Sequence, residues 1–168
     1  MVLYASLEQG LRNKMLKINK LTDYATLILS HLANNPIEVV SATDIAKNIQ
    51  LSIPTISKIL KILCGAELVK SFRGAGGGYQ LAKPANQINL TDIIFALEGD
   101  ISLTECCKGT NACKLNAECT IKENWKKIND IVKTALAGLT LSDMSKPLET
   151  LPLNLRGIPV KTIESSHG

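Results

Sequence analysis

A glycine-rich run, "GAGGG" at residues 74–78, lies between two short segments with the composition of β-strands. Residues 68–72 and 79–82 are predicted to pair as a hairpin, with the glycines forming its extended tip. The run does not fit a phosphate-binding loop, because no Lys-Ser or Lys-Thr follows it and it leads into a strand, not a helix. The sequence therefore predicts a two-stranded wing.

Three helical segments precede this hairpin. Apolar residues between positions 21 and 32 recur at the spacing of one helical face, and Thr22 is a plausible N-cap for this first helix. Ser41 is placed to cap a short second helix, with Asp44 three residues further on. Ser52 can cap the third helix. The inward face of that third helix is predicted to consist of Ile53, Ile56, Leu60 and Leu63.

Three helices followed by a two-stranded ribbon are the element order of a winged helix-turn-helix. A fourth helix is predicted from near Asn89 to Gly99. Beyond the cysteine-rich segment, apolar residues recur at alternating steps of three and four, which is the a/d stripe of a two-helix seam. This stripe consists of Trp125, Ile128, Val132, Ala135 and Leu139. The fold class is therefore mainly α: a winged helix-turn-helix with a long C-terminal dimerisation helix.

These elements divide the chain into five parts. The first residues show no strong pattern, and Met15 would itself make a natural start. The last residues contain three prolines and no sustained period, which indicates a flexible tail. The predicted parts are an N-terminal extension at 1–14, the DNA-binding domain at 15–100, a cysteine-rich loop at 101–121, the dimerisation helix at 122–144 and the tail at 145–168.

The third helix carries side chains suited to DNA. In a helix-turn-helix the second helix of the motif enters the major groove, and its first half contacts base edges. The candidate base contacts are Ser52, Thr55, Ser57 and Lys58, and Arg73 at the head of the wing could reach an adjacent minor groove. The candidate phosphate contacts are Lys47, Lys61, Lys70 and Lys83. The alternative, a protein-binding module, would normally show apolar anchors on this face.

Four of the five cysteines lie in "ECCKGTNACKLNAECTI". Cys107, Cys113 and Cys119 are separated by five residues each time, whereas zinc ligands are usually paired through two to four. Wide, even spacing favours an iron-sulfur cluster held by thiolates over zinc, and either metal over free thiols in a loop. Cys64, on the third helix, is interpreted as a buried structural thiol.

Residues 15–144 resemble the winged-helix iron-sulfur repressors that include IscR and the nitric-oxide sensor NsrR, most closely the regulators of SUF-type cluster assembly. The matching pieces are "KLTDYA", "LSIPTISKILK", "SFRGAGGGYQLAKP", "TDIIFALEGDISLTEC", the three spaced cysteines and "NWKKIND". The resemblance implies a homodimer joined through the helix around Trp125. It also implies a double-stranded DNA operator and an iron-sulfur cluster, 2Fe–2S or 4Fe–4S, on Cys107, Cys113 and Cys119.

The resemblance leaves two ligand positions open. IscR has a histidine three residues beyond its last cysteine, where this chain has Lys122. NsrR uses an aspartate from the first helix of the other subunit, which matches Asp23; the alternative is a first-turn carboxylate favoured by the helix dipole. Counting forward from "ALEGD" selects Cys106 as the first ligand, whereas counting back from Trp125 selects Cys107.

The function implied is a repressor of SUF-type cluster-assembly genes that responds to cluster occupancy. Within the same family the alternatives are a nitric oxide or iron sensor. From other classes they are an iron-sulfur carrier and a zinc-stabilised interaction protein. No enzyme is expected, because no nucleophile and base are paired and only two histidines occur. No segment is apolar enough to span a bilayer, so a cytoplasmic protein without a membrane partner is expected.

Overall fold

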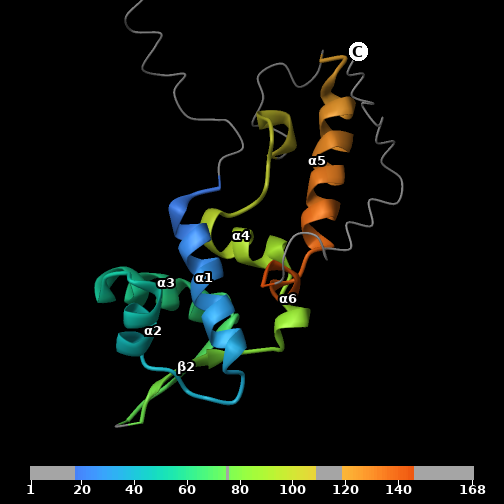
Figure 1. The fold of residues 1–168 in the computed structure, drawn as a ribbon. Coiled ribbons are helices and arrows are strands. Elements are labelled where there is room, and N and C mark those ends of the chain that lie inside the picture. The colour runs from blue at the N-terminus through green and yellow to red at the C-terminus, as the bar shows by residue number, and fades with distance from the viewer. Residues whose placement is uncertain (1–17, 75, 109–118, 146–168) are drawn as a thin grey trace, which may run out of the picture.

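The computed structural model describes three stretches of the chain, 18–74, 76–108 and 119–145 (Figure 1). The predicted N-terminal extension and all but the first residue of the predicted tail lie outside them. The helices are α1 (Lys20–Asn34), α2 (Ala42–Ile49), α3 (Ile53–Gly65), α4 (Leu90–Glu98), α5 (Lys122–Ala137) and α6 (Leu141–Met144). The strands are β1 (Val69–Phe72) and β2 (Gly78–Leu81), and short 3-10 helices occur at η1 (Ala85–Gln87) and η2 (Glu105–Cys107).

α1 is the central helix of the winged unit, in contact with α2, α3, α4, α6 and β2. Its N-cap is Asn19, whose side-chain oxygen accepts a hydrogen bond from Leu21 N at 3.4 Å. The prediction that Thr22 caps this helix is wrong. Thr22 lies inside the first turn, is 1% exposed and donates its hydroxyl hydrogen bond to Glu98 at the end of α4. The helix begins earlier because Asn19 satisfies its first amides, which leaves Thr22 to join two helices.

α3 buries one face against α1, α4 and β1. Ile56, Leu60 and Leu63 are fully buried, as predicted, together with Ile59. Ile53 was predicted to face inward but is 49% exposed, because it stands at the first helical position, ahead of the turn that packs. The core as a whole is aliphatic, with the following members: Ala25, Ile28, Leu29, Leu32, Ile45, Ala46, Ile56, Ile59, Leu60, Leu63, Leu68, Val69, Ile88, Leu90, Ile93, Ile94 and Leu141.

The wing is an antiparallel hairpin in which Val69 pairs with Leu81 and Phe72 with Gly78. The linker before α2 runs along its other edge, where Val40 and Tyr79 exchange hydrogen bonds of 2.9 and 2.8 Å. This approach is possible because residue 78 is glycine: a Cβ there would lie 2.5 Å from the Val40 carbonyl oxygen. The glycine therefore fastens the wing to the helical unit.

The region 122–144, predicted as one dimerisation helix, is two helices. α5 ends at Ala137, and Thr140 caps α6 in a capping box with Asp143. Leu141 is fully buried, and its amide donates to Ile88 O at 2.8 Å. Leu139, predicted on the stripe of the long helix, instead packs against the core. The helix breaks because Thr140 and Asp143 satisfy the amides of a new start and α6 then completes the core beside α1.

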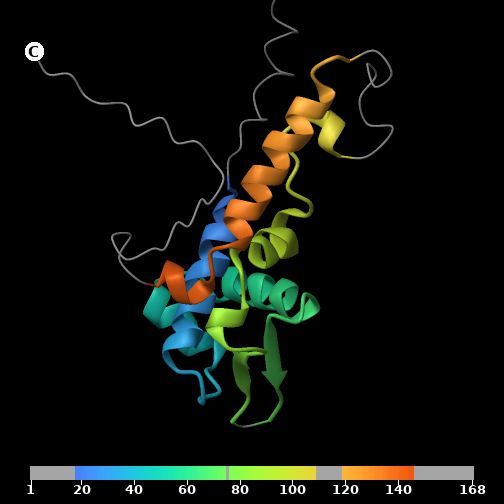
Figure 2. The ribbon, with the colours of Figure 1, turned by 90° about the vertical axis from the view of Figure 1, so that its right-hand side faces the viewer.

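α5 projects away from the wing in both views of the ribbon (Figures 1 and 2). Its contacts within the described chain are mainly with α4 and η2. On this helix Trp125, Ile128 and Ile131 are exposed by 37%, 44% and 45%, whereas Val132 and Ala135 of the predicted stripe are half-buried. Such an apolar stripe on a projecting helix is typical of a surface that another helix covers. No helix in the three described stretches has the length and apolar content needed to cross a bilayer.

Gly78→Ala is expected to lower the free energy of unfolding by about 1–3 kcal/mol, because the added methyl group collides with the Val40 carbonyl. Gly76→Ala is the matched control, since a Cβ at that position meets nothing within 4 Å. Urea unfolding followed by circular dichroism measures both. Equal stability of the two variants would show that the linker does not depend on this close approach.

Candidate nucleic-acid interface and cysteine pocket

The first turn of α3 presents the predicted DNA-contacting side chains. The Ser52 hydroxyl accepts from Thr55 N at 3.4 Å and lies 2.8 Å from the Thr55 hydroxyl, so these two side chains support each other. Ser57 and Lys58 follow on the same helix and are exposed. Because the opposite face of α3 is locked in the core, these groups are held on a rigid outer surface. Hydroxyl and ammonium groups placed in this way can hydrogen-bond base edges and phosphates.

The wing extends beside α3 at the end of the molecule opposite to η2 and the start of α5 (Figures 1 and 2). Arg73 follows β1 directly and is exposed, and Lys70 is exposed within β1. A guanidinium at the head of a hairpin can reach a groove next to the one that receives α3. The structure thus places the predicted DNA-contacting residues of α3 and of the wing at the same end of the folded molecule.

The four predicted phosphate lysines differ in their surroundings. Lys47 lies 4.0 Å from Asp44, and Lys83 lies 3.8 Å from Asp92. Lys61 and Lys70 are exposed, and neither forms an ion pair with a carboxylate of the described stretches. Exposed ion pairs are weak, so phosphate can displace the two aspartates. Of these four lysines, Lys61 and Lys70 are nevertheless the most directly available to DNA.

The cysteine turn η2 lies beside α5. Thr104 Oγ1 is 2.9 Å from Cys106 Sγ and 3.3 Å from Cys107 Sγ, and Cys107 Sγ also donates to Trp125 O at 3.6 Å. The turn is anchored by Asn129, whose side-chain oxygen accepts from Leu103 N at 3.0 Å. Asn129 is only 3% exposed. A buried amide paired in this way is costly to break, so it fixes both thiols against α5.

A pocket of about 280 Å³ opens beside these thiols. Its lining consists of Cys106, Cys107, Asn129, Asp130 and the three lysines Lys122, Lys126 and Lys133. Glu123, 2.9 Å from Lys126 Nζ, raises the pKa of the Lys126 ammonium, and the two thiols add to that rise. The same pair lowers the pKa of Glu123. Three lysine ammonium groups thus line the pocket that holds the two sulfur donors.

The predicted ligands are placed on separate elements. Cys106 and Cys107 share η2, Cys119 is half-buried just before α5, and Asp23 is exposed in the first turn of α1. Cys113 lies outside the described residues. Within the described stretches no three His, Cys, Asp or Glu side chains come together as a metal site. The soft sulfur donors of η2 suit iron or another thiophilic metal, and Asp23 belongs to a different part of the chain.

Cys64 is separate from this pocket. It lies on α3 and packs against the hydrophobic core. Burial raises the pKa of the Cys64 thiol, and a hydrogen bond with Ser71 partly opposes that rise. A thiol whose charged form is disfavoured by burial is a poor nucleophile and a poor metal ligand.

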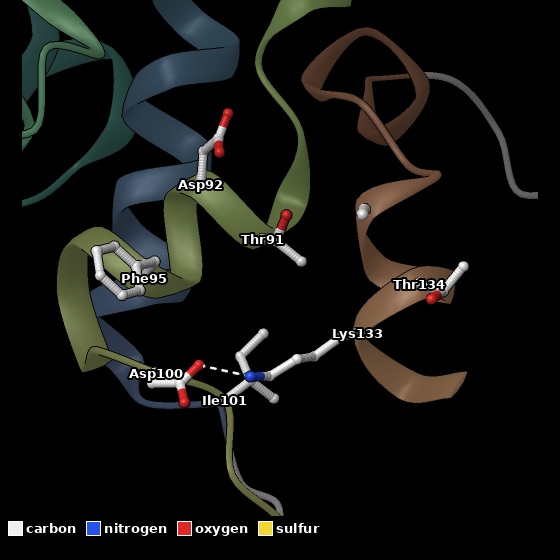
Figure 3. Close-up of a pocket in the computed structure, with 8 residues that line it drawn as sticks. Thr91, Asp92, Phe95, Asp100, Ile101, Lys133 and Thr134 are labelled. Atoms are coloured by element: carbon white, nitrogen blue, oxygen red, sulfur yellow. Dashed lines mark hydrogen bonds and ion pairs between the residues drawn. The ribbon is translucent and has the colours of Figure 1, made fainter. Parts of the chain in front are cut away.

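A groove between α4 and α5, about 410 Å³ in volume, was not predicted from the sequence (Figure 3). Phe95 of α4 lines this groove and is 65% exposed. At one side Lys133 Nζ pairs with Asp100 Oδ1 at 2.7 Å. A signal was present, since "IIFALE" is apolar on nearly every side of its helix although only one side can enter the core. The ion pair between Lys133 and Asp100, by contrast, could not be predicted from the sequence, because these residues lie far apart in it.

A rigid recognition helix, a wing, a projecting apolar helix and a cysteine turn at its start together define a winged-helix DNA-binding regulator. Residues 18–147 match the family model Rrf2, described as an iron-dependent transcriptional regulator. The chain therefore belongs to the Rrf2 family, whose members are transcriptional regulators and not enzymes.

Known proteins share both its sequence and its fold. The HTH-type transcriptional regulator NsrR of Oceanobacillus iheyensis is 38% identical over 146 residues, which cover 85% of this chain and 98% of that protein. The structure of CymR, the global cysteine regulator of B. subtilis, has a TM-score of 0.64 at 35% identity and covers 78% of this chain and 97% of CymR. T. potens IscR has a TM-score of 0.58 at 32% identity and covers 77% and 85%.

Lys61→Ala is expected to weaken binding to the DNA upstream of the chain's own gene. It should also reduce the slope of log affinity against log salt by about one, because one phosphate-contacting cation no longer displaces counterions. Lys127→Ala, an exposed lysine on α5, is the matched control and should leave the slope unchanged. Fluorescence anisotropy over a salt series gives both quantities. An unchanged slope for Lys61→Ala would remove Lys61 from the interface.

Asn129→Leu is expected to destabilise the protein by roughly 1–3 kcal/mol, because Leu103 N loses its acceptor in a largely buried place. Amide hydrogen exchange should accelerate at Leu103 more than in α3. Asn124→Leu, on the exposed side of the same helix, controls for the change of residue type. If Leu103 exchanges equally slowly in both variants, Asn129 does not anchor the cysteine turn.

Proposed function

We propose that this chain is a homodimeric repressor whose affinity for its operator depends on an iron-sulfur cluster. The protein ligands would be Cys106 or Cys107, with Cys113, Cys119 and Asp23 of the partner subunit. The genes it controls would be those of SUF-type cluster assembly. The family description, an iron-dependent transcriptional regulator, supports the dependence on iron. The similarity to NsrR and to T. potens IscR supports the cysteine chemistry.

The observation that carries the proposal is the attachment of segment 98–107 to two helices. Near the cysteine turn, Asn129 holds Leu103 and Cys107 donates to Trp125 O, so the turn is fixed to α5. At the beginning of the segment, Glu98 accepts from Thr22 Oγ1 and, at 2.8 Å, from Asn19 N. A displacement of the turn would therefore be passed along this segment to the start of α1.

α1 connects this attachment to DNA. It packs against α3, whose outer face carries the candidate base contacts. In a dimer, α1 and α3 of each subunit set the separation of the two recognition helices, and that separation must match the half-site spacing of an operator. A coupling of about 1–3 kcal/mol between the cysteine turn and the DNA face would change affinity about 5- to 150-fold.

The dimer is supported by the apolar stripe of α5. Trp125 and Ile128 are partly exposed on a helix whose contacts within the described chain are mainly with α4 and η2. Two such stripes packed together would remove this surface from water. The role proposed for Asp23 requires that this pairing bring α1 of one subunit toward the cysteine turn of the other. The proposed iron-sulfur cluster, when bound, would link the cysteine turn of one subunit to α1 of the other, and this link would depend on iron supply and oxidation.

Protein purified without oxygen is expected to be coloured and to contain iron and sulfide. Its affinity for the upstream DNA should differ at least about five-fold from that of the same protein after chelation. Absorption spectra, iron and sulfide assays and gel shifts provide the measurements. Colourless protein that contains only zinc would favour the zinc-stabilised alternative. Equal DNA affinities before and after chelation would show that the bound metal does not regulate DNA binding.

Asp23→Ala is expected to speed loss of the cluster to a chelator, because one ligand is replaced by a methyl group. Glu38→Ala, which removes another exposed carboxylate, is the matched control. The metal-free variant should lose only the interaction of a first-turn carboxylate with the helix dipole, about 0.3–1 kcal/mol. Equal rates of cluster loss in the two variants would exclude Asp23 as a ligand.

A further inference from the structure

The cysteine-rich segment has one thiol more than the three evenly spaced cysteines, and the additional thiol is adjacent to one of them. In an extended strand, neighbouring side chains point to opposite faces. In η2 they do not, because both sulfurs approach the same Thr104 hydroxyl, at 2.9 Å for Cys106 and 3.3 Å for Cys107. The two sulfurs therefore cannot lie farther apart than the sum of these distances. Adjacent thiols that converge on one atom can bind one ligand together.

The pair is accessible and fixed in place. Cys106 and Cys107 are free thiols, partly exposed, and both line the pocket of about 280 Å³ beside α5. Asn129 holds the segment that leads into the turn. Among the described residues, these two sulfurs are not part of a group of three or more His, Cys, Asp or Glu side chains that could hold a metal ion. A ligand that needs only two thiols therefore fits the pair.

We propose that Cys106 and Cys107 form a vicinal dithiol site for trivalent arsenic compounds. With an organoarsenical oxide, each thiol sulfur forms one bond to arsenic, the arsenic–oxygen bond breaks, and the two thiol protons leave with the oxygen as water. Arsenic remains trivalent, so the step needs no oxidant or reductant. Attachment through two sulfurs of one turn makes the second bond intramolecular, which raises affinity by about 10²–10⁴-fold over a single sulfur.

The regulatory consequence, unlike the site itself, rests on the proposed function. A metalloid on this pair would occupy both Cys106 and Cys107, and so would remove whichever of the two is a ligand of the cluster. The regulator would then respond to the metalloid as it responds to loss of iron. The site can be tested on the metal-free protein, so its failure and that of the proposed function are distinguishable.

The test uses the full chain, reduced and free of metal, with phenylarsine oxide as the probe. Intact-mass spectrometry should show one phenylarsenic group per chain that survives excess 2-mercaptoethanol and is removed by 2,3-dimercaptopropanol. Cys106→Ser and Cys107→Ser should each lower the affinity for the probe by about 10²-fold or more. Cys64→Ser and Cys119→Ser should retain it. Circular dichroism confirms that the variants are folded.

Two results would overturn the proposal. Release of the probe from the unsubstituted chain by 2-mercaptoethanol would show attachment through one sulfur only. Retention of a dithiol-sensitive adduct by Cys106→Ser would show that Cys107 pairs with a distant cysteine and not with its neighbour. On cluster-loaded protein, the probe should also bleach the absorption of the unsubstituted chain faster than that of Cys106→Ser. Equal bleaching would overturn the regulatory consequence alone.

Discussion

The segment between Glu98 and Cys107 is fastened at both ends, and the relation between the cysteine turn and the DNA face depends on this. Glu98 ties its beginning to the first turn of α1, and Asn129 ties its far part to α5 through Leu103. Thr22 and Asn129 are almost completely buried, so loss of either contact leaves a polar group without water as a substitute partner. The segment is therefore a short connection between two helices and not a free loop.

The orientation of α5 relative to the winged unit rests on few contacts. α5 meets the described chain mainly at α4 and η2, and the Lys133–Asp100 ion pair at the edge of the α4–α5 groove is partly exposed and screened by salt. The winged unit, by contrast, is closed by a continuous aliphatic core that includes Leu141 from α6. A free-energy change of a few kcal/mol at the cysteine turn can thus alter the orientation of α5 relative to the winged unit without disturbing α3. This division fits the proposed mechanism, in which the DNA-binding surface stays constant while the geometry of the proposed dimer varies.

Local signals predicted the winged unit well, because caps and turns are encoded by neighbouring residues. Asn89 and Gly99 bound α4 as expected, and Ser52 caps α3. The errors arose where contacts between residues far apart in the sequence determine the local structure. Thr22 joins α4 instead of capping α1, and the single helix expected at 122–144 breaks because Leu141 is drawn into a core built from the first half of the chain. The sequence contains the capping box of Thr140 and Asp143, but it does not reveal the packing of Leu141 in the core, which makes the second helix favourable.

The cysteine turn shows a different limit of sequence reasoning. Counting from the two flanking motifs selected either Cys106 or Cys107 as the first ligand. In an extended strand, a shift of one residue turns a side chain to the opposite face. In η2 the shift has no such effect, because Thr104 lies next to both sulfurs and both line one pocket. Whichever cysteine serves as a metal ligand, the other remains beside it. A neighbouring thiol in the same pocket can exchange with the ligand or bind jointly with it, so the ambiguity in the sequence corresponds to a chemical property of the turn.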